Sequence, residues 1–172
     1  RVGVILGSGL GGLADELSEP VEIPYLEIPG WPVATAVGHA GTLVLGTLGG
    51  VPLAVMRGRA HLYEGIGADR VAFGVRVLGR LGIRSLVVTN AAGGIDPAYR
   101  PGQLVLISDH VNLQGTSSLV GANDDSLGPR FPDMSEPYDH ALIAKAKEIA
   151  STNDIPVRVG CYVGLTGPTL ET

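Results

Sequence analysis

Continuous runs of apolar residues, separated by segments rich in glycine and proline, predict short strands interleaved with helices along this chain of 172 residues. A short run rich in Val, Ile and Leu is typical of a strand that is buried on both faces. The runs lie at Val2 to Leu6, Thr42 to Leu48, Val51 to Met56, Ile83 to Thr89, Gln103 to Ser108 and Val157 to Leu165. Gly49-Gly50, between the second and third runs, suits the tight turn of a hairpin.

Apolar residues at helical spacing predict two longer helices. One runs from Asp69, a suitable capping residue, to Leu81, and Gly82 ends it. Its apolar residues form two stripes, so we expect this helix to be buried on two sides. The other begins at Pro137, because proline is favoured at the first position of a helix. Its core-facing stripe is expected to consist of Tyr138, Leu142, Ala146 and Ile149.

A brief helix is expected after Gly12, and Pro20 is expected to close it. Gly115 to Ser135 has little apolar periodicity and predicts a long loop. Loops of this length are usually functional or become ordered against a partner. Strands interleaved with helices, together with one hairpin, predict an α/β fold with a mixed β-sheet core flanked by helices.

Composition narrows the class of protein. The length and a hydrophobic content of 45% predict a single folded domain over residues 1–172. The net charge of −5 argues against a nucleic-acid surface, and no apolar run approaches the ~20 residues that span a bilayer. We recognise no signal peptide, and the single cysteine, Cys161, cannot form an intrachain disulfide. These features favour a cytoplasmic protein that binds neither nucleic acid nor membrane.

Basic and aromatic side chains follow the apolar run Val51 to Met56. If the chain stays extended, Arg57, Arg59, His61 and Tyr63 project from the same face. A guanidinium, an imidazole and a phenol at the exit of a buried strand predict a pocket for an oxyanion beside a sugar.

A glycine-rich loop from Gly7 to Gly12 follows the first strand and matches the pattern G-x-G-x-x-G. Such a loop lets backbone approach a phosphate, although a simple tight turn explains the same glycines. Pro20 and Pro24 interrupt the helix and strand that a dinucleotide site needs. We therefore favour a phosphate loop in which Ser8 adds a hydroxyl donor, and a dinucleotide-dependent oxidoreductase remains an alternative that rests on this loop alone.

Other polar residues are weaker candidates. The segment from Asn90 to Gly94 follows a predicted strand. Its backbone amides and the Asn90 side chain could contact a ligand at the carboxyl edge of the sheet. Alternatively, the segment is only a turn. His39 and Glu171 are each open to a site role or a structural one. His110 is expected to satisfy a strand end and His140 to be exposed on its helix. No group of histidines or acids has metal-ligand spacing, so no metal is predicted.

Seven short motifs occur in one order along nearly the whole chain. They are Gly-Ser-Gly-Leu-Gly-Gly at 7–12, Gly-His-Ala-Gly at 38–41, Gly-Arg-Ala-His-Leu-Tyr-Glu-Gly at 58–65, Thr-Asn-Ala-Ala-Gly-Gly at 89–94, Asp-His-Val-Asn at 109–112, Arg-Phe-Pro at 130–132 and Gly-Pro-Thr-Leu-Glu-Thr at 167–172. In this combination the chain resembles the trimeric purine nucleoside phosphorylases, in the family that includes methylthioadenosine phosphorylase. Asn90 to Gly93 and the loop from Asn123 to Ser135 resemble the purine nucleoside branch.

The resemblance implies a nucleoside phosphorylase-like fold and reversible phosphorolysis of purine nucleosides, of the inosine or guanosine type, to the free base and ribose 1-phosphate. It implies inorganic phosphate as co-substrate, no cofactor or metal, and a homotrimer. Phosphate would be held by Ser8, His39, Arg59, His61 and the Ala91 amide; ribose by Tyr63 and by Phe131 of a neighbouring subunit; the purine by Glu171, Ala92, Gly93 and Leu170. His61 and Asn90 are the candidate catalytic residues.

Two departures from the family pattern stand out. Leu170 occupies a position where the family usually has an aromatic residue against the base. The segments that form the family's last third are missing, so the resemblance implies a domain that is incomplete at its C-terminus. A truncated, non-catalytic protein that binds phosphate or nucleoside, and a methylthioadenosine phosphorylase-like activity, are therefore kept as alternatives.

Overall fold

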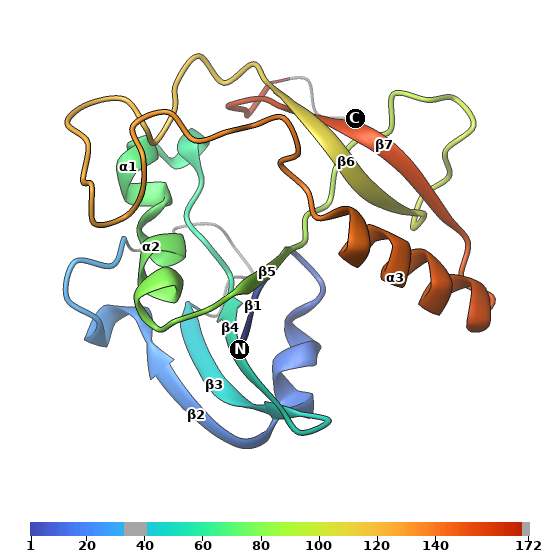
Figure 1. Cartoon of the computed structure of the whole chain (residues 1–172), viewed down its shortest axis with the longest axis horizontal. Coiled ribbons are helices and arrows are strands. Elements are labelled where there is room, and N and C mark those ends of the chain that lie inside the picture. The colour runs from blue at the N-terminus through green and yellow to red at the C-terminus, as the bar shows by residue number, and fades with distance from the viewer. Residues whose placement is uncertain (33–40, 170–172) are drawn as a thin grey trace. The chain divides into compact units, whose positions relative to one another are not determined.

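The computed structural model describes residues 1–32 and 41–169. The chain divides into two compact units, Arg1–Ala92 and Gly93–Thr172, and each is described here by itself. The first unit holds a five-stranded mixed sheet and the second a two-stranded parallel sheet (Figure 1). The predicted class, an α/β fold with a mixed sheet and flanking helices, is confirmed.

The first sheet is built around β1, which pairs in parallel on both sides. Its strands are β1 (Val2–Leu6), β2 (Ser18–Pro24), β3 (Thr42–Leu48), β4 (Val51–Arg57) and β5 (Ser85–Val88), in the order β2-β3-β4-β1-β5. The pairs β1–β4 and β1–β5 are parallel, whereas β2–β3 and β3–β4 are antiparallel. Gly49 and Gly50 close the β3–β4 hairpin with φ of 56° and 78°, as predicted for a tight turn that needs positive φ at both positions.

Each face of this sheet carries its own core, because successive residues of a strand point to opposite faces. One core packs helix α2 (Phe73–Arg80) and the aromatic pair Tyr25 and Trp31 against the sheet. Its buried members from the strands and the helix are Ile5, Leu43, Ala54, Met56 and Leu78. The other core packs the 3-10 helix η1 (Gly11–Glu16) and the residue after it against Val4, Leu6, Val44 and Val55.

Strand β2 is a correction to the sequence prediction. Pro20 does not close a helix; η1 ends at Glu16, and Pro20 lies inside β2. Among the described strands β2 is at the edge of its sheet, and the pairing is irregular between Ser18 and Val21. A proline lacks the N–H that an inner strand must donate, but an edge strand with a bulge tolerates it. The short 3-10 helix η2 (Tyr25–Glu27) follows.

The helix predicted from Asp69 to Leu81 is two shorter helices. These are α1 (Ala68–Val71) and α2, and the break between them is at Ala72. Gly67, with no side-chain cap, precedes α1, so Asp69 is not the cap. Gly82 has a φ of 76° just past the end of α2, as expected. The predicted burial on two sides is wrong: in α2 Gly74 and Leu78 are buried, whereas Val75 is 44% exposed.

The second unit contains β6 (Leu104–Asn112), β7 (Val157–Gly164) and α3 (His140–Thr152), which packs against β6 (Figure 1). Strand β6 continues past the predicted end at Ser108, so His110 lies within the strand. Asp139 caps α3 by accepting hydrogen bonds from the N–H groups of Ala141 and Leu142, and the predicted start at Pro137 is therefore wrong.

None of the four residues predicted as the core-facing stripe of α3 is fully buried. The buried residue of the helix is Ala150, whereas Leu142 and Ile149 are about half exposed. Tyr138 precedes the helix, because the side-chain cap at Asp139 makes His140 the first helical residue. The long loop predicted between Gly115 and Ser135 is confirmed, since this described segment contains only turns and bends.

Candidate functional site

Three loops of the first unit lie at one edge of the five-stranded sheet. Because β4, β1 and β5 are parallel neighbours, their carboxyl ends, at Arg57, Leu6 and Val88, lie at the same edge. The segments 7–12, 58–65 and 89–92 follow these strands directly. The carboxyl edge of parallel strands is where open α/β sheets bind ligands.

Gly7 and Thr89 join the first and third of these loops. The Gly7 N–H donates to Thr89 Oγ1 at 2.8 Å, and Thr89 Oγ1 donates to the Ile5 carbonyl at 3.1 Å. A Cβ atom on Gly7 would lie 2.9 Å from the Thr89 carbonyl oxygen and 3.0 Å from the Cα of Asn90. A glycine is therefore required at position 7, and the exposed Ser8 that follows is held beside the 89–92 segment.

Arg59 links the same two strand ends from the middle loop. Its Nη1 donates to the Thr89 carbonyl at 2.8 Å and to the Leu6 carbonyl at 3.3 Å. The guanidinium is therefore fixed where β1 and β5 end, next to the glycine loop. A permanently charged group with several N–H donors suits the recognition of an oxyanion at this position.

His61 is held by a carboxylate three residues further on. It precedes the 3-10 helix η3 (Leu62–Glu64), and the two residues form a capping box. Glu64 Oε1 accepts from the His61 N–H at 2.7 Å and lies 3.1 Å from His61 Nδ1. The imidazole stacks on the half-exposed ring of Tyr63, with centroids 5.0 Å apart. The Glu64 side chain is only 2% exposed, so it orients the imidazole from inside the protein.

Glu64 is a site residue that sequence reasoning missed. The signal was present, because a carboxylate at the third helical position after a polar residue is the pattern of a capping box. It was obscured because Glu64 falls in the same motif as Arg59, His61 and Tyr63, whose side chains carry the more obvious chemistry.

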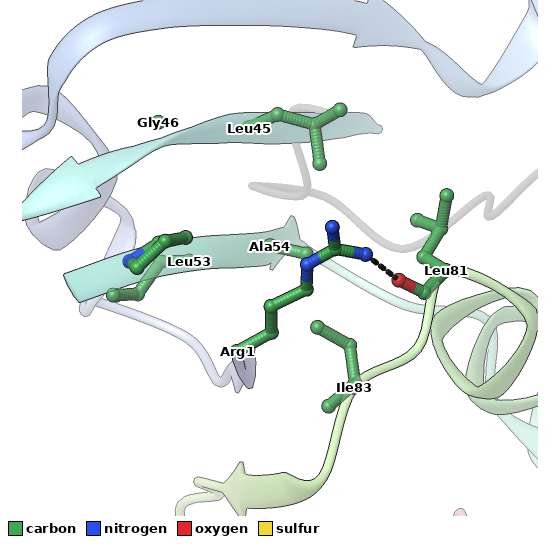
Figure 2. Close-up of a pocket in the computed structure, with 8 residues that line it drawn as sticks. Arg1, Leu45, Gly46, Leu53, Ala54, Leu81 and Ile83 are labelled. Atoms are coloured by element: carbon green, nitrogen blue, oxygen red, sulfur yellow. Dashed lines mark hydrogen bonds between the residues drawn. The ribbon is translucent and has the colours of Figure 1, made fainter.

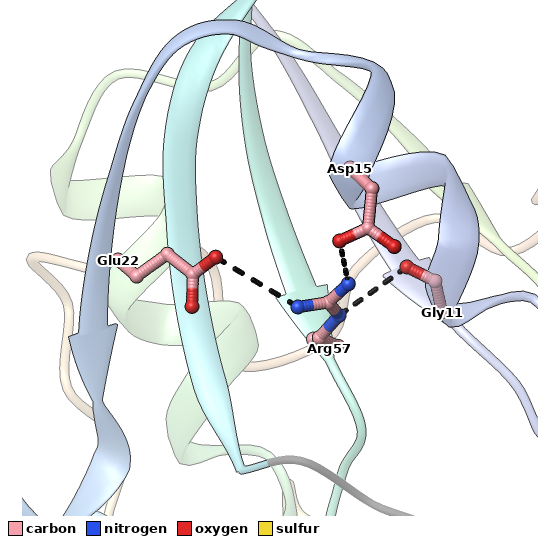
Figure 3. Close-up of polar contacts among 4 residues, drawn as sticks. All are labelled: Gly11, Asp15, Glu22 and Arg57. Atoms are coloured by element: carbon pink, nitrogen blue, oxygen red, sulfur yellow. Dashed lines mark hydrogen bonds and ion pairs between the residues drawn. The ribbon is translucent and has the colours of Figure 1, made fainter.

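Contrary to the prediction, Arg57 does not share a face with Arg59, His61 and Tyr63. Gly58 has a φ of 97°, so the extended chain ends at Arg57 and the alternation of faces does not continue. The guanidinium of Arg57 instead meets the Gly11 carbonyl and the carboxylates of Asp15 and Glu22 (Figure 3). The predicted convergence therefore holds for His61 and Tyr63, which stack, but not for Arg57.

The remaining predicted site residues that the structure describes are exposed. Asn90, Ala91 and Ala92 are exposed at the end of the first unit. Gly93 and Phe131 belong to the second unit, in which Phe131 is 87% exposed. Three further predicted residues, His39, Leu170 and Glu171, lie outside the described residues.

Where the structure describes the chain, the other histidines and the acidic residues are not gathered into a metal site. His110 Nδ1 lies 3.1 Å from the Tyr138 hydroxyl, and His140 is exposed, as expected. Burial, followed by the nearby charge of Asp109, raises the pKa of Tyr138. Within residues 1–32 and 41–169, no three His, Cys, Asp or Glu side chains could together hold a metal ion. Over the same ranges no helix is long and apolar enough to cross a membrane.

A separate apolar cavity lies at the other end of β1. It has a volume of about 230 Å³ and lies among Leu45, Leu53, Leu81 and Ile83, next to Arg1 (Figure 2). The Arg1 guanidinium donates to the Leu81 carbonyl at 3.0 Å. Because Arg1 precedes β1 and the three loops follow the opposite ends of the parallel strands, this cavity is not part of the candidate site formed by the three loops.

The chain matches a known family over its whole length. The profile of the Phosphorylase superfamily matches residues 1–172, and the chain belongs to that family. Purine nucleoside phosphorylase 1 of Bacillus subtilis (strain 168) is 51% identical over 172 residues, which are 100% of this chain and 64% of the relative. Purine nucleoside phosphorylase of Rattus norvegicus is 45% identical over 179 aligned residues, covering 100% of this chain and 61% of the rat protein.

Solved structures give the same family. One match is a crystal structure of isoform 2 of purine nucleoside phosphorylase from Schistosoma mansoni in complex with cytosine and ribose-1-phosphate. Its TM-score is 0.93 and its sequence identity 45%, and the match covers 100% of this chain and 62% of that one. A schistosoma purine nucleoside phosphorylase in complex with hypoxanthine matches with a TM-score of 0.92 and 43% identity, covering 99% of this chain and 62% of that one. The chain thus spans a little under two thirds of the length of the relatives it matches.

Proposed function

We propose that the complete protein containing this chain is a purine nucleoside phosphorylase, which transfers the pentosyl group of inosine- or guanosine-type nucleosides to inorganic phosphate. The observation that carries the proposal is the position of Arg59, whose guanidinium is fixed at the ends of β1 and β5 beside two loops rich in small residues. Relatives named purine nucleoside phosphorylase, at 51% and 45% identity, support the same activity.

The three loops suit a phosphate ion. Ser8 offers a hydroxyl and its own N–H, Arg59 a charged donor, and Ala91 an exposed backbone amide. In the proposal His61, oriented by Glu64, completes the phosphate site from the middle loop, and His39 contributes near the phosphate entrance. Phosphate acts as the co-substrate, and the reaction as proposed requires no cofactor or metal.

The sugar and base are assigned to residues next to this site. We assign the ribose to Tyr63, which stacks on His61 and keeps about half of its surface exposed, and to Phe131 of a neighbouring subunit in a homotrimer. The 87% exposure of Phe131 supports a role at an interface. Residues proposed to contact the purine are Ala92, Gly93, Leu170 and Glu171. The proposed catalytic residues are Asn90 and His61.

The chemistry follows from charge separation. Breaking the glycosidic bond develops positive charge on the ribose and negative charge on the departing purine. A phosphate dianion held beneath the anomeric carbon stabilises the sugar and becomes its new bond partner, and donors near the base stabilise the purine anion. Holding phosphate and nucleoside in line contributes up to about 7–11 kcal/mol in favourable cases.

The proposal also includes a domain assignment and a cellular compartment. We assign residues 1–172 to one phosphorylase domain, because a single family profile spans both compact units. We also place the protein in the cytoplasm, a reducing compartment that suits its exposed free cysteine, Cys161.

The test is phosphate-dependent release of hypoxanthine from inosine by the complete protein. We expect turnover that requires phosphate and yields ribose 1-phosphate, and an Arg59→Met variant with a KM for phosphate about 10- to 100-fold higher, because it loses charge-assisted hydrogen bonds. Arg84→Met, at an exposed arginine outside the three loops, is the matched control. No release of base, or release that does not depend on phosphate, would overturn the proposal.

A further inference from the structure

Arg57 connects three segments of the first unit through one side chain. Its Nε donates to the Gly11 carbonyl at 3.2 Å, its Nη2 forms an ion pair with Asp15, and its Nη1 lies 3.8 Å from Glu22 Oε1 (Figure 3). The Arg57 side chain is only 19% exposed, whereas Asp15 and Glu22 are 63% and 51% exposed. The hydrogen bond to Gly11 is therefore the shielded part of this cluster, and the two carboxylates form its solvated side.

Gly11 is where the glycine loop ends and η1 begins. The other end of the loop is held by the hydrogen bond from the Gly7 N–H to Thr89. Between these two anchors lie the exposed Ser8 and Gly9, whose φ is 83°. Because glycine has more backbone conformations available than any other residue, a loop of this composition needs anchors to keep one shape.

The guanidinium groups of Arg57 and Arg59 are both positioned by the carboxyl end of β4. Arg57 is the last residue of β4, and Arg59 follows two residues later, after the positive-φ turn at Gly58. Arg59 reaches the carboxyl ends of β1 and β5, and Arg57 reaches the exit of the glycine loop. The short segment from Arg57 to Arg59 thus sets the position of Ser8 relative to the Arg59 guanidinium.

We propose that Arg57 is a positioning residue for phosphate binding: it holds the Gly7–Gly11 loop in the shape in which Ser8 and Arg59 act on the same anion, without touching that anion itself. This inference rests on the proposed function, because it assigns the loop to phosphate. In this proposal the Arg57 Nε–H, which donates to the Gly11 carbonyl, fixes the loop. The ion pairs with Asp15 and Glu22 contribute to the stability of the fold.

Substitutions separate the two contributions. Arg57→Met removes the donor and the charge, and we expect it to raise the KM for phosphate and the phosphate Kd about 10-fold while kcat at saturating phosphate stays within about twofold. Arg57→Gln is the rescue variant, because its amide nitrogen replaces Nε at the same distance along the side chain but carries no charge. We expect R57Q to keep the phosphate KM within about threefold of wild type.

Asp15→Asn is the matched control, since it removes the ion pair and leaves the bond to Gly11. We expect D15N to lower Tm and to leave the phosphate KM unchanged. Measurements are made well below the lowest Tm of the set, with the complete protein. A purely structural Arg57 would lower Tm in all three variants with no change in phosphate KM, and that result overturns the inference. R57Q as impaired as R57M would also overturn it, because charge would then be the working property.

Calorimetric titration with inorganic phosphate separates this inference from the proposed function. If the wild-type protein binds phosphate without turnover and R57M binds it about 10-fold more weakly, the phosphorylase activity is refuted and the role of Arg57 stands. If the wild type turns over nucleoside and R57M keeps a normal phosphate Kd, the activity stands and the role of Arg57 is refuted. A wild-type protein that binds no phosphate refutes both.

Discussion

The buried carboxylate of Glu64 accepts a hydrogen bond from the His61 N–H at 2.7 Å and lies 3.1 Å from Nδ1 of the same imidazole. One side chain thus fixes both the backbone and the ring of His61. The 2% exposure of the Glu64 side chain means that water cannot easily replace it in either contact.

Replacing Glu64 tests whether this arrangement matters for activity. Glu64→Gln keeps the size and an acceptor oxygen but removes the charge, so the ring of His61 is held less firmly. We expect kcat/KM for phosphate to fall about 10-fold, the lower end of the loss seen when the orienting partner of a metal-binding histidine is changed. Steady-state kinetics with Glu148→Gln, at a carboxylate that is 66% exposed on α3, provides the control. An E64Q enzyme with wild-type kinetics would show that His61 needs no orientation.

Two threonines of the first unit should respond oppositely to the same substitution. Thr89→Val removes the acceptor of the Gly7 N–H and the donor to Ile5, and we expect a loss of about 1–3 kcal/mol in the free energy of unfolding. In the part of the chain that the structure describes, Thr42 Oγ1 is buried without a hydrogen-bond partner. Thr42→Val should therefore leave stability unchanged or raise it, as urea denaturation at fixed protein concentration can show. Equal effects of T89V and T42V would contradict this assignment.

Two glycines of α2 provide a second matched pair. A Cβ on Gly74 would lie 2.5 Å from Met56 Cε and 3.1 Å from Trp31 Cζ2, whereas a Cβ on Gly79 would meet nothing within 4 Å. Gly79→Ala should raise the free energy of unfolding by about 0.5–1 kcal/mol through helix propensity. Gly74→Ala should lower it, because overpacking costs about 1–3 kcal/mol and exceeds that gain. Thermal unfolding of the two variants gives the order of stability, and G74A as stable as G79A would contradict the packing described here.

The phenol of Tyr25 makes stability depend on alkaline pH. Its hydroxyl donates to the Gly58 carbonyl at 2.8 Å, and burial raises its pKa well above the ordinary range. The folded state therefore favours the protonated phenol. This contribution is complete below the unfolded-state pKa of about 10 and is lost as pH rises above that value.

The measurement is the free energy of unfolding between about pH 8 and pH 11. We expect it to fall above about pH 10, and Tyr25→Phe to reduce that slope while lowering stability by about 1 kcal/mol at pH 8. Some slope remains in the variant, because the pKa of Tyr138 is also raised. An unchanged slope in Y25F would mean that Tyr25 ionises equally well in the folded state.

The strands were predictable wherever burial on both faces produced a continuous apolar run. Val2 to Leu6 and Thr42 to Leu48 coincide with β1 and β3, because both lie inside the sheet. Strand β2 was missed because an edge strand needs no such run and tolerates Pro20 at a bulge. The predicted starts of the helices were wrong because the capping residues differ from those expected. Gly67 is the N-cap of α1, and Asp139 is the N-cap of α3.

The loops of the site were predictable as motifs, but their contacts were not. Residue types in the 58–65 segment were sufficient to single out Arg59 and His61 as candidates for anion binding, a role that stays a prediction. Whether Arg57 shares a face with Arg59 and His61 depended on a single positive φ at Gly58, which neither the apolar pattern nor the charge of the segment specifies. The contact between Gly7 and Thr89 joins residues far apart in the sequence, and only the parallel pairing of β1 with β5 brings them together.

That pairing also has a consequence for folding. Parallel strands cannot be joined by a tight turn, and Val2 pairs with Leu53 on one side of β1 and with Ser85 on the other. Such distant pairings form slowly, because a long stretch of chain must be ordered before they can close. The three loops therefore come together only when nearly all of the first unit has folded, and a nascent chain that has not yet paired β5 lacks the 89–92 side of the candidate site.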